Sequence, residues 1–167
     1  MSRILESHRK WLWDQFAEHG IEGFKPAKDK RLVATWFREG KVESAHITAL
    51  DWLQRRREAC EAVGVANGER VACTRSPDAS RAAKQDAMND VAGALAAVRT
   101  RAGNLCAVAI DELIENPRVT KHGLRLRLKV DYKRVYPICL HALETLATYR
   151  EECIREREKW NRRSFVP

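Results

Sequence analysis

The spacing of apolar residues, which repeats with the period of an α-helix, constrains this chain more than any other feature. After Asp131, the residues Val135, Ile138, Ala142 and Leu146 recur at intervals of three and four. This spacing places them along one face of a helix and leaves the other faces polar. Several other segments show the same pattern and end at Gly or Pro. We therefore predict an all-α fold, a multi-helix bundle of about six helices.

Capping residues and turn residues divide the chain into segments. The turn-rich stretch 64–80 is predicted to be a linker between an N-terminal helical part, 1–63, and a second helical part, 81–167. Near the end of the linker, Ser76 or Asp78 can begin a long Ala-rich helix. The predicted helices cover residues 2–19, 29–39, 44–63, 76–100, 105–114, 120–128 and 131–148, with a charged helical continuation over 149–163.

Composition excludes several classes of protein. The chain has 167 residues, enough for one domain or for one domain with a small annex. It contains no apolar run of about 18 residues, so we expect no membrane span. Charges interrupt the N-terminal segment where a signal peptide needs an apolar core. The five cysteines form no Cys-x-x-Cys pair and read as reduced thiols, so we expect a cytoplasmic protein.

No motif in the chain indicates an enzyme. None of the five histidines is spaced from another His, a Cys or a carboxylate as metal ligands are, and there is no Gly-rich phosphate loop. The adjacent carboxylates Asp111 and Glu112 point about 100° apart on a helix, so they do not converge on one site. We expect no catalytic site, no metal, no cofactor and no small-molecule substrate.

The net charge of +8 is concentrated in the last third of the chain. Residues 1–117 carry a net charge of +1, whereas residues 118–167 carry +7. The segment 118–134 alone has seven basic residues and one acidic residue. Such a local excess indicates a polyanionic partner. A second basic run, Arg55-Arg56-Arg57, is closely followed by Glu58 and Glu61 and is predicted to be a solvated helix face.

The start of this basic segment fits two secondary structures. Leu124, Leu126, Leu128 and Val130 alternate with basic residues, which is the pattern of a strand. The same segment also fits a short helix, with Thr120 as the N-cap and Leu124 and Leu128 one turn apart on one face. Both alternatives stay open from the sequence.

The helical alternative completes a helix–turn–helix, in which the second helix enters the major groove of DNA. The turn would lie at Lys129-Val130, and Asp131 would cap the longer second helix. The residues expected to hold the two helices together are Leu124, Leu128, Val130, Val135 and Ile138. The candidate nucleic-acid-binding residues are Lys121, Arg125, Arg127, Lys129, Tyr132, Lys133, Arg134 and Tyr136.

The run from Leu128 to Ile138, followed by Ala142-Leu143 and Leu146, resembles the C-terminal helix–turn–helix of bacterial sigma factors and LuxR-type regulators, within 120–148. More broadly, 43–149 is similar in layout to a helical domain of phage and prophage proteins that occurs in activators of gene-transfer-agent clusters. That likeness rests on Ile47-Thr48-Ala49, on the Arg55-Arg56-Arg57 run and on the Ala142-to-Ala147 segment. The resemblance implies a transcription regulator that contacts double-stranded DNA, RNA polymerase, or both.

Two residues depart from the helix–turn–helix pattern. Lys129 stands where the family has Gly, and a left-handed conformation there costs a non-Gly residue about 1 kcal/mol. Pro137 removes the hydrogen bond to the Lys133 carbonyl and is expected to kink the second helix. Pro137 and the five Trp favour the alternative function, a non-enzymatic interaction module or inhibitor that docks on a host nucleic-acid machine.

Overall fold

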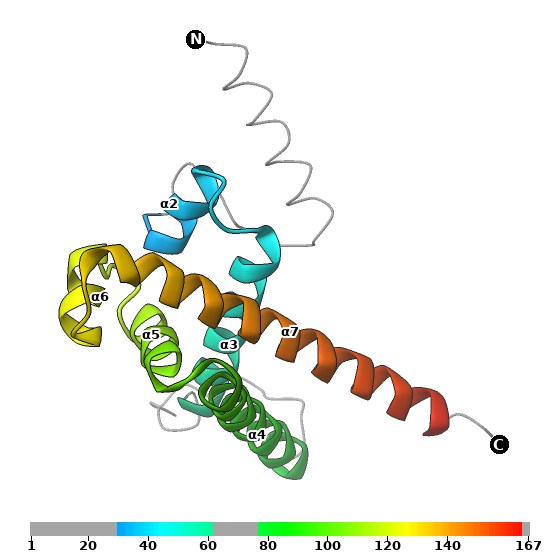
Figure 1. Cartoon of the computed structure of the whole chain (residues 1–167). Coiled ribbons are helices and arrows are strands. Elements are labelled where there is room, and N and C mark those ends of the chain that lie inside the picture. Colours follow the sequence, from blue (N-terminus) through cyan, green and yellow to red (C-terminus); the bar gives the residue numbers. More distant parts are fainter. Residues whose placement is uncertain (1–29, 62–76, 165–167) are drawn as a thin grey trace.

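The computed structural model describes residues 30–61 and 77–164 (Figure 1). In these two ranges the chain forms six α-helices and no strand, so the predicted all-α bundle is confirmed. The helices are α2 (Leu32–Arg38), α3 (Ser44–Glu61), α4 (Pro77–Ala102), α5 (Asn104–Glu115), α6 (Lys121–Leu128) and α7 (Tyr132–Ser164). The predicted helix 2–19 and most of the predicted linker lie outside the described residues. Within the described ranges, no helix is long and apolar enough to cross a membrane.

Helix α7 is the element around which the bundle is organised. It runs diagonally across the molecule and packs against α3, α4, α5 and α6 (Figure 1). Its apolar stripe is fully buried at Val135, Cys139, Leu143 and Leu146. Residues of α2 and α3 belong to the same core cluster. The parts on either side of the predicted linker therefore share one hydrophobic core.

Helix α4 begins at Pro77, between Ser76 and Asp78, the two residues predicted to start it. Residues 77–80, the last part of the predicted linker, are therefore helical. Proline suits the first position of a helix, since the missing N–H would have no helical partner there. The small-residue stripe predicted for this helix is buried at Ala87, Ala94 and Val98. A Cβ at Gly93 would overlap the Tyr149 hydroxyl, so α4 and α7 approach closely at this glycine.

The basic segment forms helix α6 up to Leu128, so the strand alternative for residues 124–130 is wrong. The Thr120 side chain accepts a hydrogen bond of 3.1 Å from the N–H of Gly123 and caps α6, as predicted. The helix ends at Lys129, which has the left-handed conformation (φ 54°, ψ 44°). Helix α7 starts at Tyr132, so only residues 129–131 separate the two helices.

Helix α7 continues without interruption through Pro137 to Ser164. It therefore joins the predicted helix 131–148 and its charged continuation in one element (Figure 1). Pro137 has no N–H, so the Lys133 carbonyl lacks its usual helical donor, but the helix continues beyond it.

Candidate nucleic-acid interface

Helices α6 and α7 pack through the side chains that the spacing predicts. Leu124, Leu128 and Val135 are buried, and Val130 and Ile138 are half-buried against the core. Because each helix turns its apolar stripe toward the other, the basic residues between those positions must face outward.

Four basic residues of this helix pair, Arg125, Lys129, Lys133 and Arg134, have exposed side chains. Within the part of the chain that the structure describes, none of the four forms an ion pair. Other basic residues are neutralised by neighbouring helices, such as Arg101, which donates to both carboxylate oxygens of Glu152 at 3.0 and 2.9 Å. The four exposed cations thus keep their full charge for an external anion.

The turn between the helices borders a groove, which we call the α6–α7 groove. It has a volume of about 400 Å³ and is lined by Arg125, Leu126, Lys129, Val130, Asp131 and Arg134. Three of these residues are cations and one is an acid, so the charged part of the lining is mainly basic. Leu126, on the same groove, is 58% exposed.

Two other candidate residues contact each other. The Lys121 ammonium lies 4.2 Å from the centre of the Tyr132 ring, a cation–π contact between the first turns of α6 and α7. Tyr132 remains 51% exposed. This contact joins the first turns of α6 and α7 and leaves about half of the Tyr132 surface exposed.

Tyr136 does not point away from the helix pair as the sequence suggested. Its ring packs edge-on against Trp36, with ring centres 5.3 Å apart, and its hydroxyl donates a 2.6 Å hydrogen bond to the Lys41 carbonyl. The reason is physical: an aromatic ring gains more from packing against Trp36 than from exposure. Tyr136 therefore joins α7 to α2 and the segment after it.

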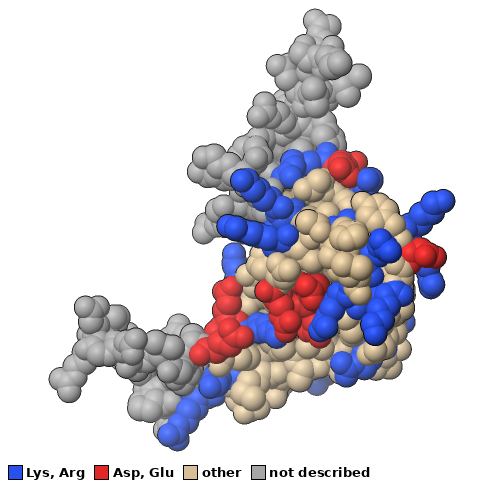
Figure 2. All heavy atoms as spheres, turned by 90° about the vertical axis from the view of Figure 1, so that its left-hand side faces the viewer, with Lys and Arg blue, Asp and Glu red and all other residues tan. Residues whose placement is uncertain are grey.

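Arg127 is also engaged within the protein. Its Nε lies 3.4 Å from a carboxylate oxygen of Glu112 on α5. Glu112 is close to Asp111 and Glu115 on the same helix, and burial raises the pKa of Asp111. Figure 2 shows a compact group of acidic side chains on this side of the molecule, with basic side chains around it. The segment 118–134 therefore does not form one continuous basic face.

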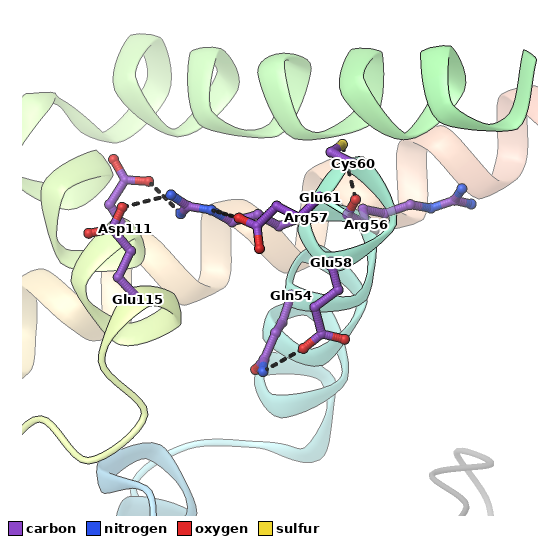
Figure 3. Close-up of polar contacts among 8 residues, drawn as sticks. All are labelled: Gln54, Arg56, Arg57, Glu58, Cys60, Glu61, Asp111 and Glu115. Carbon is purple, nitrogen blue, oxygen red and sulfur yellow. Dashed lines mark hydrogen bonds and ion pairs between the residues drawn. The ribbon is translucent and has the colours of Figure 1, made fainter. Parts of the chain in front are cut away.

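The Arg55-Arg56-Arg57 run differs from the predicted solvated face, because two of its members join helices. Arg56 Nε lies 3.1 Å from the Asp90 carboxylate of α4. Arg57 donates a 2.6 Å hydrogen bond to Glu115 of α5 (Figure 3). Arg57 also lies 3.7 Å from Asp111. Only Arg55 is exposed. Their partners on α4 and α5 are distant in sequence, so no local pattern could have indicated these contacts.

In comparisons with known protein families, curated proteins and solved structures, nothing matches this chain. The residues that the structure describes contain no group of three His, Cys, Asp or Glu side chains that could hold a metal ion.

Proposed function

We propose that this chain is a transcription regulator of the phage or prophage type that binds double-stranded DNA through α6, the turn and the start of α7. The observation that supports it is the cluster of exposed, unpaired cations (Arg125, Lys129, Lys133 and Arg134) on two packed helices joined by residues 129–131. Short turns and this packing are typical of helix–turn–helix units. Unpaired cations are what the DNA phosphates require.

In the proposed complex, the two helices have different roles. The first turns of α7 enter the major groove, so that Tyr132 and Lys133 reach base edges. Helix α6 crosses the backbone, where Arg125 and Lys129 contact phosphates. Arg134, which lines the α6–α7 groove, also contacts phosphates of the DNA backbone. Arg127 contributes less, because Glu112 already neutralises it.

The test is a salt titration of binding to a fluorescent DNA duplex of about 30 base pairs, or three helical turns. Each phosphate contact makes the slope of log K against log[salt] more negative by about 0.9. The slope for the Arg125→Ala/Lys129→Ala variant should therefore be less negative than that of the wild type by about 2. The matched control is Arg162→Ala/Arg163→Ala, which removes the same charge from exposed residues near the end of α7. Absence of binding at low salt, or equal losses in both variants, would contradict the proposal.

A second candidate function, docking on RNA polymerase or another host protein, has its own support. Leu126 and Tyr132 are 58% and 51% exposed among the cations, and apolar exposure of this kind favours a protein surface over phosphates. Purified RNA polymerase that has been treated with nuclease should then bind the wild-type protein but not the Leu126→Ser/Tyr132→Ala variant. If the complex disappears on nuclease treatment, nucleic acid bridges the two proteins, and the result supports DNA binding instead of protein docking.

A further inference from the structure

A second groove lies between α7 and the corner where α4 meets α5, and we call it the α5–α7 groove. Its volume is about 380 Å³, close to that of the α6–α7 groove. Arg134 lines both grooves, so they run along neighbouring parts of α7. The lining of the second groove, however, is chemically different.

The floor of the α5–α7 groove is apolar. It is formed mainly by Leu105 at the start of α5 and by Pro137 and Ile138 of α7. Leu105 is 40% exposed and Pro137 is exposed, although both lie in a concave part of the surface. The Cys106 thiol, which also lines the groove, lies 3.5 Å from the Ile138 carbonyl, a contact between α5 and α7. Exposed apolar side chains in a concavity indicate a surface that a partner covers.

The rim of this groove is basic. It carries Lys133, Arg134 and His141, and no carboxylate lines the groove. Among the described residues, Lys133 and Arg134 form no ion pair, and His141 Nδ1 lies 4.0 Å from Glu144. The occupant must therefore combine an apolar side chain with negative charge.

We propose that the α5–α7 groove binds an acidic peptide segment of a partner protein. One aliphatic or aromatic side chain of the peptide rests on Leu105, Pro137 and Ile138, and its flanking Asp or Glu carboxylates bind Lys133 and Arg134. DNA matches this lining less well, because phosphates gain nothing from the apolar floor. The inference goes beyond the proposed function: since Arg134 lines both grooves, the peptide and DNA compete.

The experiment selects peptides from a phage-displayed random library on the full-length chain. Enriched peptides should carry an apolar residue flanked by Asp or Glu. A fluorescent synthetic copy of one such peptide then reports the affinity. The Leu105→Ser variant should weaken its binding about ten-fold, since much of the apolar anchor surface is removed. The matched control, Ile154→Ser, changes an equally exposed aliphatic residue of the second half of α7, outside both grooves, and should leave peptide affinity unchanged.

Several results would overturn the proposal. They are a library that yields no peptide, enriched peptides without acidic residues, and an affinity that Leu105→Ser leaves intact. Circular dichroism of both variants checks that each keeps its helical fold. The wild-type duplex titration, repeated with Leu105→Ser, separates the two proposals, because this uncharged change lies outside the DNA contacts. DNA binding without peptide binding contradicts only the groove, and peptide binding without DNA binding contradicts only the proposed function.

Discussion

At the scale of single residues, Lys129 shows how one backbone conformation joins two helices. It is the one non-Gly residue with positive φ in the described ranges, and its N–H bonds back to the Arg125 carbonyl to close α6. A left-handed residue at the end of a helix satisfies carbonyls that the helix leaves unpaired. The residue with this strained backbone is also one of the four exposed cations. A lysine at position 129 therefore supplies a positive charge but makes the protein less stable than a glycine would.

Replacing Lys129 by Gly should therefore stabilise the protein. Glycine adopts positive φ without a Cβ clash, and relief of the strain is worth about 1 kcal/mol in the free energy of unfolding. The matched control is Lys129→Ala, which removes the same charge but keeps a Cβ. Urea unfolding of both variants separates the two effects. If Ala stabilises the protein as much as Gly does, charge repulsion and not backbone strain is the cause.

His46 gives the protein a pH-dependent stability. Its side chain is 7% exposed, and its Nδ1 accepts a 3.0 Å hydrogen bond from the Glu43 N–H at the start of α3. Burial lowers the pKa of His46, although the carboxylates of Glu43 and Glu144 oppose the shift. The unfolded chain therefore binds a proton more readily than the folded protein. Stability is complete above the unfolded pKa of 6.5 and is lost as the pH falls through the folded pKa.

We expect the free energy of unfolding to decline between about pH 7 and pH 5, and the His46→Asn variant to lose part of that decline. The variant is also less stable at neutral pH, so the readout is the slope against pH and not the absolute value. His122→Asn, at an exposed histidine of α6, is the control and should keep the wild-type slope. Parallel slopes for wild type and His46→Asn would show that another group causes the decline.

At the scale of elements, Asp90 of α4 joins three helices. Arg157 of α7 donates from Nη2 to both of its carboxylate oxygens at 2.7 Å, and Arg56 of α3 approaches at 3.1 Å. The Asp90 side chain is only 10% exposed, whereas those of Arg157 and Arg56 are 48% and 32% exposed. One carboxylate thus binds two guanidinium groups and attaches the second half of α7 to the bundle.

Asp90→Asn should destabilise the protein by about 2 kcal/mol. The value lies below that of a fully buried ion pair, because solvent screens both arginines. Thermal or urea unfolding measures it. Asp86→Asn, one turn earlier on α4 and exposed, should change the free energy of unfolding by less than about 0.5 kcal/mol. Equal losses in the two variants would mean that helix charge, and not the contact with Arg157 and Arg56, matters at this position.

At the scale of the whole molecule, the arrangement of charge differs from its distribution along the chain. The acidic side chains Asp111, Glu112 and Glu115 of α5 reach toward basic residues of α3 and α6. Glu115 and Glu112 pair with Arg57 and Arg127. Figure 2 shows acidic side chains gathered among basic ones on this side of the molecule. The proposed DNA contact is therefore limited to the turn and the start of α7.

If DNA binds there, Glu112→Gln should strengthen binding. The substitution releases Arg127 and removes a negative charge beside the phosphates, which is worth about 0.5–1 kcal/mol, or a two- to five-fold gain in affinity at low salt. Glu151→Gln changes the net charge equally, but at an exposed residue of the second half of α7. A gain of the same size in both variants would indicate a general effect of net charge instead of a local one.

Within the described residues, the sequence by itself predicted the buried stripes of α4 and α7 and, for the helical alternative of the basic segment, the Thr120 cap. These depend on interactions within a few residues, and their signals are local spacing and capping. Only the tertiary structure decided between helix and strand at 124–128, turned Tyr136 onto Trp36, and gave Arg56, Arg57 and Arg127 their acidic partners. Whether a cation is neutralised depends on which helices pack together, and packing joins residues that lie far apart in the chain.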